Sequence, residues 1–272
     1  MKFLSRFYIA LIFLILYAPI LVVILFSFNR SGSLSQFSGF SFYWYRELFR
    51  DGEALKALKN SLILAVLSSL LATVLGTLCA FAIDRSKRKW FARSVETVTN
   101  IPMMNPDIVT GVSMMLLFVG VAGLLKTTSL LGFWTMLIAH TTFNLPYVTL
   151  SVLPKLRQMD NSLSEAALDL GCTPAQTFFR VELPSILPGV LSGLMMSFTL
   201  SLDDFVISHF VSSADFRTLP LYIYNQTAHE VKFSMYALCT LIILVILALL
   251  ITVNFAGSVG QRRQRRKVGA RR

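Results

Sequence analysis

Charge is scarce in this chain of 272 residues. Charged residues make up 14% of it, whereas a typical soluble domain has about 25%, and hydrophobic residues make up 55%. The mean hydropathy is +0.66. This composition excludes a disordered chain, a collagen-like fibre and an ordinary soluble enzyme. We therefore expect a bundle of helices in a lipid bilayer, an all-α membrane protein.

Cysteine is also scarce, and so are the motifs of metal and nucleotide sites. Cys79, Cys172 and Cys239 form no Cys-x-x-Cys pair, so neither a disulfide framework nor a zinc site is indicated. The sequence has no Gly-x-x-x-x-Gly-Lys motif, so the chain is not expected to hold ATP phosphates in the usual way. We expect no enzyme activity, no cofactor and no metal in this chain.

Six apolar runs are long enough to span a bilayer, which takes about 20 residues. They are Phe7–Phe28, Leu62–Ile83, Val95–Val121, Leu131–Leu153, Ile186–Phe210 and Met235–Phe255. Lys2 and Arg6 precede the first run as in a signal peptide, but no small-residue cleavage site follows it, so we interpret it as a span. The expected organisation is an N-terminal helix (1–28), an outer loop (29–60), a core of five spans (61–257) and a basic tail (258–272).

The distribution of Lys and Arg predicts the orientation. With the N-terminus inside, the inner segments hold 17 of these residues and the outer segments hold 8. Because inner loops of membrane proteins are rich in Lys and Arg, both termini are expected in the cytoplasm. The net charge of +11 is explained in this way rather than by nucleic acid binding, and the basic tail is expected to contact anionic lipid. The aromatic outer loop is consistent with an interfacial belt that contains a short helix, or with a docking surface for an outside partner.

The inner loop 154–185 contains two helix-start signals. Ser162 and Glu165 have the spacing of a capping box, which predicts a helix over 163–170 that stops at Gly171. Thr173 followed by Pro174 predicts a second helix, which should end before Pro184. The loop is therefore expected to be two short helices joined by a glycine elbow.

The first of these helices has an apolar face. Leu163, Ala166, Ala167 and Leu170 lie at helical spacing. A helix this short is not stable by itself, so the face needs a groove in a partner or the helix ends of the chain itself. A DNA-reading helix-turn-helix is a poor alternative, because the unit lies between two spans and carries little positive charge.

The loop resembles the coupling loop of ABC importer permeases. The pattern Glu-Ala-Ala-x3-Gly-x9-Ile-x-Leu-Pro is matched with one departure, a valine at position 181 in place of Ile. The resemblance implies the type I permease fold over nearly the whole chain, with six transmembrane helices. It also implies that the loop docks on a cytoplasmic ATPase. The residues carried over to this coupling role are Glu165, Ala166, Ala167, Gly171, Leu183 and Pro184.

Other segments narrow the resemblance to the permease subunits of spermidine/putrescine importers. These segments are Tyr17–Ile20, Met103–Val109, Phe143–Val148 and Ser197–Asp204. The resemblance implies import of polyamines across a bacterial inner membrane. It further implies three kinds of partner, namely a second permease subunit, an ATPase dimer that binds the ATP, and an extracytoplasmic polyamine-binding protein.

Three carboxylates lie within the expected spans: Asp107, Asp203 and Asp204. Each costs about 2.5–3.5 kcal/mol at the bilayer centre on insertion scales, so each needs a reason. They are candidates for a substrate path, because an ammonium group that loses water needs oxygen acceptors. Adjacent helical residues point about 100° apart, so we expect one of Asp203 and Asp204 to line the path and the other to serve helix packing.

Proline and glycine mark further features of the spans. Pro102, Pro106 and Pro146 each remove a backbone donor, and we expect the break beside Asp107 to form a cavity wall. Gly189-x-x-x-Gly193 predicts close packing of the fifth span against a neighbour.

Functions other than that of a polyamine permease fit parts of the sequence. An ABC permease for another small solute fits the same spans. An intramembrane aspartyl protease would need Asp107 paired with Asp203 or Asp204, but it would leave the capped loop unexplained. A stand-alone secondary transporter is disfavoured because no internal repeat is evident.

Overall fold

The computed structural model describes residues 2–33, 36–127, 130–227, 232–248 and 251, and in these ranges every regular element is a helix. This confirms the expected all-α class. The chain divides into two compact units. The terminal unit comprises Met1–Leu55 and Ile223–Arg272, and the central unit comprises Lys56–Tyr222.

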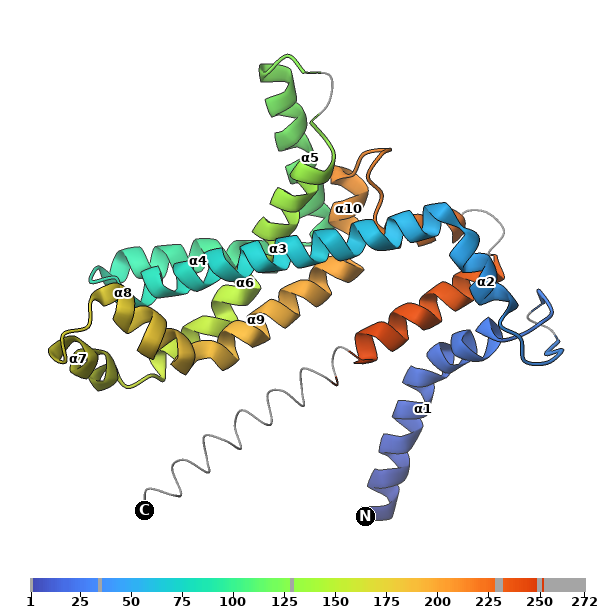
Figure 1. Cartoon of the computed structure of the whole chain (residues 1–272), viewed down its shortest axis with the longest axis horizontal. Helices are drawn as coiled ribbons and strands as arrows, with labels where there is room; N and C mark the ends of the chain where they lie inside the picture. Colours follow the sequence, from blue (N-terminus) through green and yellow to red (C-terminus); the bar gives the residue numbers. More distant parts are fainter. Residues whose placement is uncertain (1, 34–35, 128–129, 228–231, 249–250, 252–272) are drawn as a thin grey trace. The chain divides into compact units, whose positions relative to one another are not determined.

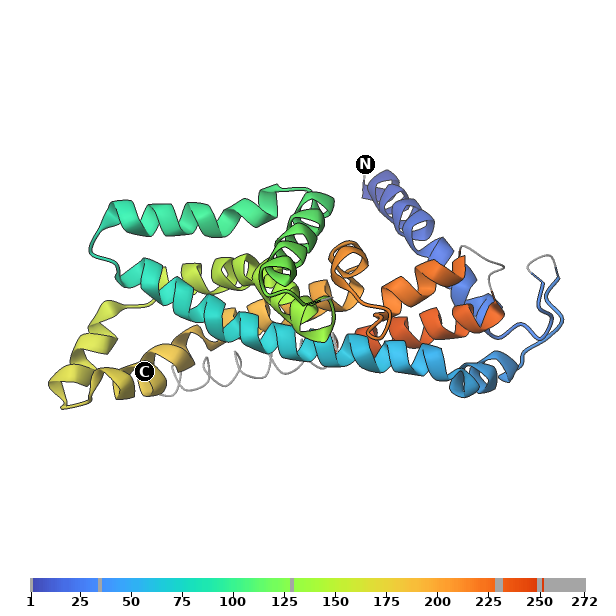
Figure 2. The same ribbon diagram turned by 90° about the horizontal axis from the view of Figure 1, so that it is seen from above.

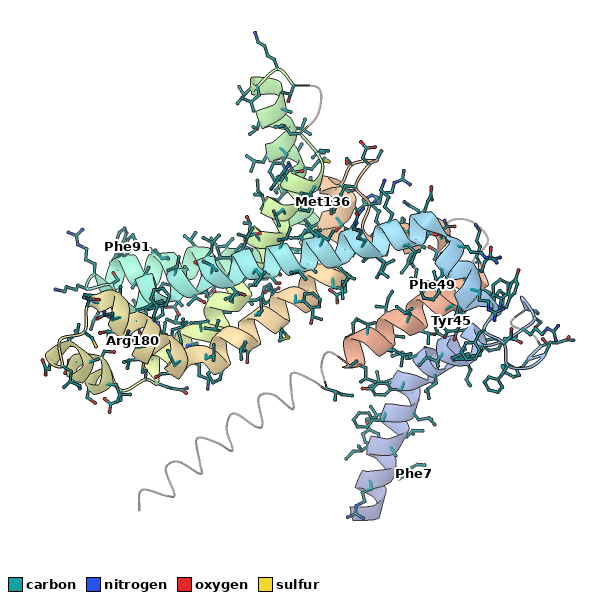
Figure 3. The ribbon with its side chains drawn as sticks, viewed as in Figure 1. Phe7, Tyr45, Phe49, Phe91, Met136 and Arg180 are labelled. Atoms are coloured by element: carbon teal, nitrogen blue, oxygen red, sulfur yellow. The ribbon has the colours of Figure 1, made fainter. Side chains whose placement is uncertain are left out.

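The terminal unit contains α1 (Lys2–Ser27), α2 (Tyr43–Arg50) and the helix Phe233–Ala248. The segment between α1 and α2 is folded back on Asn29, whose carbonyl accepts a hydrogen bond from Trp44 Nε1 at 2.7 Å. The Trp44 ring also packs against Phe233, with ring centroids 5.5 Å apart. Figure 3 labels Tyr45 and Phe49, two of the aromatic residues on the short α2, which is the helix expected in the outer loop.

The central unit is built on long helices. Those that precede the inner loop are α3 (Gly52–Arg85), α4 (Lys89–Met104), α5 (Asp107–Leu124) and α6 (Phe133–Arg157). The inner loop contains α7 (Asn161–Asp169), α8 (Pro174–Thr177) and a π-helical turn, η1 (Phe178–Glu182). The remaining helices are α9 (Leu183–Asp203), α10 (Val206–Val211) and α11 (Leu219–Thr227).

Helix α6 is the centre of this unit, and it lies beside α9 (Figures 1 and 2). The close approach depends on glycine. A Cβ on Gly189 would lie 2.8 Å from the carbonyl oxygen of Ser151, and one on Gly193 would lie 3.1 Å from the Cα of Val148. A Cβ on Gly76 of α3 would lie 2.8 Å from the Cβ of the same valine. The Gly189-x-x-x-Gly193 pattern therefore does make close helix packing.

Two apolar clusters lie along α6. The first joins its early half, which contains Met136 and Phe143, to α3, α5 and α10. The second joins its later half, which contains Val152 and Leu156, to α3 and to Ile186 of α9. Figure 3 shows Met136 in the first region, away from Arg180 in the inner loop. Apolar packing thus ties the inner loop's flanking helices together.

Five described helices are long and apolar enough to cross a membrane. These contain or overlap the first five expected spans, but the third expected span, 95–121, is wrong as a single helix. It is divided between α4 and α5, because Asn105 is extended (φ −83°, ψ 142°). The residue before a proline is pushed out of the helical region, and here Pro106 follows.

The last two expected spans also need comment. The fifth, 186–210, is divided because α9 ends at Asp203 and Asp204 is extended before α10 begins. The described part of the sixth is the helix Phe233–Ala248, which is shorter than a span, and residues 249–250 and 252–255 lie outside the described residues. The basic tail, 258–272, also lies outside them.

Candidate functional site

The first helix of the inner loop, α7, begins earlier than expected. Its N-cap is Asp160, whose carboxylate accepts the backbone N–H of Ser162 at 3.0 Å, so the predicted capping box of Ser162 with Glu165 is wrong. Aspartate is as good a cap as serine, and its position ahead of Asn161 adds helical residues. The hydrogen bonds from the backbone and then the side chain of Ser162 lower the pKa of the Asp160 carboxyl from its usual value.

The end of α7 is as expected. Gly171 has φ +86°, a conformation that is costly for residues with a Cβ. Its N–H donates to Leu168 O at 2.9 Å, and the N–H of Cys172 donates to Ala167 O at 3.1 Å. These two bonds make a Schellman motif, which satisfies the free carbonyls at a helix end. The glycine elbow is confirmed.

The second helix start is also as expected, but the second helix end is not. Thr173 and Gln176 form a reciprocal capping box, with Pro174 at the first helical position. The helix does not end before Pro184; it continues through η1 into α9, giving one helical path from Pro174 to Asp203. Pro184, the second residue of α9, directly follows the π turn, and an irregular turn of this kind is where a continuous helix accommodates a residue without an N–H.

The residues that match the coupling-loop pattern are mostly exposed on the surface of the protein. Glu165, Ala166 and Leu170 are exposed, and Leu170 has 86% of its surface accessible. Ala167 is buried, so the predicted apolar face is divided between the interior and the surface. Leu183 is partly buried against the second apolar cluster, whereas Pro184 is exposed. The loop therefore presents small and apolar side chains beside the carboxylate of Glu165.

A buried carboxylate in the loop was missed in the sequence. The side chain of Glu182, in η1, is 4% exposed and forms an ion pair with Arg85 at the end of α3. Its Oε1 also accepts a hydrogen bond from Ser164 Oγ of α7 at 2.9 Å. Glu182 stands at an unspecified position of the loop pattern, so only its place before Leu183 and Pro184 could have drawn attention to it.

A second ion pair lies at the other end of the loop. Arg157 is the last residue of α6, and its guanidinium lies 3.0 Å from the carboxylate of Glu96 in α4. This pair is more open than the first, with side chains 53% and 33% exposed. The loop is thus held by an ion pair at each end. In one pair the carboxylate is buried, and in the other both side chains are largely solvated.

Two of the three candidate path carboxylates are exposed at helix ends. Asp107 is the first residue of α5, and Asp203 is the last of α9. Helix α5 packs on α10, where Gly111 meets Phe210. The structure therefore brings α5 and α10 together, and it leaves the side chains of Asp107 and Asp203 exposed.

Asp204 differs from its neighbour. Its side chain is 8% exposed and accepts the backbone N–H groups of Ile207 at 3.2 Å and Ser208 at 2.8 Å, which secures the start of α10. His140 Nε2 lies 3.5 Å from the carboxylate. Asp204 is therefore held by the backbone N–H groups of α10 and lies beside the His140 ring, inside the protein.

His140 is the centre of a buried polar cluster. Its Nδ1 lies 2.7 Å from Ser201 Oγ, which in turn lies 2.8 Å from Ser68 Oγ. Its Nε2 lies 3.3 Å from Ser208 Oγ. The cluster joins α3, α6, α9 and α10, so His140 is an interhelical hydrogen-bonding residue.

Comparisons with known proteins place the chain in a family. Residues 72–267 match the family described as "Binding-protein-dependent transport system inner membrane component". The putrescine transport system permease protein PotI of Escherichia coli is 38% identical, over 85% of this chain and 82% of that protein. The spermidine/putrescine permease PotC of Haemophilus influenzae is 38% identical over 92% and 94%. The PotC of Escherichia coli is 37% identical over 88% of both chains.

Solved structures agree on the fold. A chain of a bacterial ABC transporter that imports alginate has a TM-score of 0.75 at 18% identity, covering 96% of this chain and 95% of that one. A chain of the MetNI methionine ABC transporter has a TM-score of 0.58 at 20% identity, covering 82% and 98%. The chain therefore belongs to the inner-membrane permease family of binding-protein-dependent transport systems.

Proposed function

We propose that this chain is a permease subunit of an ATP-driven importer of polyamines. The observation that carries the proposal is identity of 37–38% over most of the chain to permeases named for putrescine and for spermidine/putrescine. Two exposed carboxylates at helix ends, Asp107 and Asp203, support a cationic substrate. The wider family transports many solutes, and a permease for another small solute is the second candidate.

The energy would come from a separate ATPase dimer, since the chain has no phosphate-binding Gly-x-x-x-x-Gly-Lys motif. In this proposal the exposed face of α7 and its elbow forms the docking surface, with Glu165, Ala166 and Leu170 outward and Gly171 setting the turn. This surface is supported from within by the buried Ala167, and beside it lie Leu183 and Pro184. A second permease subunit and an extracytoplasmic polyamine-binding protein would complete the assembly.

The carboxylates would act as transient acceptors for ammonium groups. Asp107 and Asp203 are the path residues in this proposal, because both are accessible, while Asp204 serves the packing of α10. An ammonium that leaves water needs oxygen acceptors, and a carboxylate supplies them with opposite charge. Each contact must be weak enough to allow release, as in other conduction paths.

The proposed location is a bacterial inner membrane, with both termini and the inner loop in the cytoplasm. The charge distribution supports this orientation. It is tested with single cysteines in a chain whose native cysteines are replaced. Cysteines at Ser38 and Ala214 should react with an impermeant thiol reagent from outside, and one at Ala175 should react only after the membrane is opened. The opposite pattern would move the loop away from a cytoplasmic ATPase.

Transport is tested with the complete complex in proteoliposomes. ATP would be enclosed in the lumen, on the ATPase side, while the binding protein and radiolabelled putrescine or spermidine would be added outside. We expect accumulation that requires both ATP and the binding protein. Methionine and an alginate oligosaccharide are the control solutes. Uptake of neither polyamine by an assembled, ATP-hydrolysing complex would refute the polyamine assignment and favour another solute.

A further inference from the structure

Glu182 is a buried acidic residue that the proposed docking surface and substrate path do not use. Its side chain is 4% exposed, and a carboxylate is rarely buried this far unless it is paired. Its partners lie on two other elements, since Arg85 ends α3 and Ser164 lies in the middle of α7. One side chain in η1 therefore joins three segments.

These partners link two segments that are not neighbours along the backbone, the inner loop and α3. The inner loop continues directly into α9 through η1, and it follows α6 through residues 158–160. Helix α3 is distant in sequence from the loop, so it is connected to the loop through side chains alone. Phe81 of α3 packs on Phe178 of η1, with ring centroids 4.8 Å apart, which closes the same junction.

Two of the described side chains of α7 face inward, and one of them, Ser164, belongs to this junction. Ser164 and Ala167 are buried, while the residues around them are exposed. Ser164 Oγ donates to Glu182 Oε1, so its hydroxyl fixes the rotation of α7 about the helix axis. Figures 1 and 2 both show α7 and α8 at the end of the central unit where α3 turns into α4.

We propose that Glu182 is a positioning residue that ties the coupling helix α7 to the Arg85 end of α3. Movement of the docked loop then reaches α3 as well as α9, and the two helices move together. The proposal rests on the proposed role of the loop in ATPase coupling. Burial of Glu182 strengthens the link, because removing Arg85 or the Ser164 hydroxyl leaves a buried carboxylate with one partner fewer.

The chain supplies a matched control in the second ion pair. Glu96 and Arg157 flank the same loop, but both side chains are substantially solvated. Exposed pairs of this kind contribute little, so loss of the Glu96 charge should have no effect on coupling. A difference between Glu96→Gln and Glu182→Gln therefore reports the buried junction and not the loss of a charge near the loop.

The first test measures polyamine taken up per ATP hydrolysed in proteoliposomes with equal amounts of assembled complex. We expect Glu182→Ala and Arg85→Gln to lower this ratio roughly tenfold or more. Glu182→Gln keeps an acceptor for Ser164 and should lower it less, while Glu96→Gln should match the parent. Arg85 is exposed, so Arg85→Gln remains informative if Glu182→Ala does not assemble. A parent ratio in Arg85→Gln or in assembled Glu182→Ala would overturn the proposal.

The second test needs no solute. Spin labels on cysteines at Ala82 in α3 and Ser162 in α7, with native cysteines replaced, give the distance between the two helices with and without ATP. We expect one narrow distribution in the parent complex and a broad one in Arg85→Gln. An unchanged narrow distribution in that variant would overturn the proposal. Absence of polyamine uptake by the parent would refute the proposed substrate alone, since the distance measurement would still decide the role of Glu182.

Discussion

Replacement of Gly171 tests the geometry of the loop most directly. Its φ of +86° is a left-handed conformation, and nothing lies within 4 Å of the place where a Cβ would be. A Cβ would therefore meet no steric obstacle from its neighbours, and its cost would be backbone strain. For an L-residue this strain is roughly 1–2 kcal/mol, and it is greater for a β-branched one.

The strain would be relieved by opening the Schellman motif. The bonds from Gly171 to Leu168 and from Cys172 to Ala167 would then be lost, and each contributes about 0.5–1.5 kcal/mol. A cost of one or two kcal/mol changes the ratio of the two loop conformations by about 5–30-fold. We expect Gly171→Asn to lose the least polyamine uptake, Gly171→Ala to lose more and Gly171→Val to lose the most, because asparagine tolerates the left-handed region best.

The assay is initial uptake rate, together with the amount of ATPase that co-purifies with each variant. Gly120 supplies the control, since it is helical, has open space within 4 Å of the place where a Cβ would lie and has no positive φ. Gly120→Ala should assemble and transport like the parent. If Gly171→Val retained parental ATPase recovery and uptake, the reasoning from the elbow to docking would be refuted.

Three further predictions concern the carboxylates and the packing of α9. Asp203→Asn should lower the rate of polyamine uptake strongly while the complex still assembles normally. Asp204→Asn should lower the thermal stability of the complex, because it weakens the start of α10. Parental uptake in Asp203→Asn together with parental stability in Asp204→Asn would contradict this division. Gly193→Val should destabilise the chain by about 1–3 kcal/mol through a clash with Val148, which is measured as a lower melting temperature in detergent. Asp160 has a lowered pKa, so its cap on α7 is present above the ordinary aspartate pKa and is lost as the pH falls through the folded value; Asp160→Asn should make ATPase co-purification less sensitive to acid, and unchanged acid sensitivity would contradict it.

Local chemistry made the elbow and the second helix start of the loop predictable. The capping box of Thr173 with Gln176 and the positive φ of Gly171 depend on residues close in sequence, so their spacing was sufficient. The start of α7 was misjudged because Asp160 and Ser162 are both good caps, and sequence spacing does not decide between them. The break beside Asp107 was expected from Pro106, but the apolar run on both sides of it was still counted as one span, whereas the structure has two helices that are separated at Asn105.

The features that were missed depend on contacts between distant residues. Glu182 and Arg85 are far apart in the chain, and only the packing of α3 on the loop brings them together. The same holds for His140 and Asp204, whose proximity changed the interpretation of a candidate path residue. No periodicity or local motif specifies such pairs, whereas the family pattern located the loop in which one of them lies.

The continuous helix from Pro174 to Asp203 also converts a small tilt at the loop into a larger displacement at its other end. Its 30 residues extend about 45 Å at 1.5 Å per residue. A tilt of about 5° about the loop end of such a rod displaces the other end by about 4 Å. The carboxylate of Asp203 stands at that far end, so in the proposed path a slight reorientation of the loop would bring this acceptor to a passing cation or withdraw it.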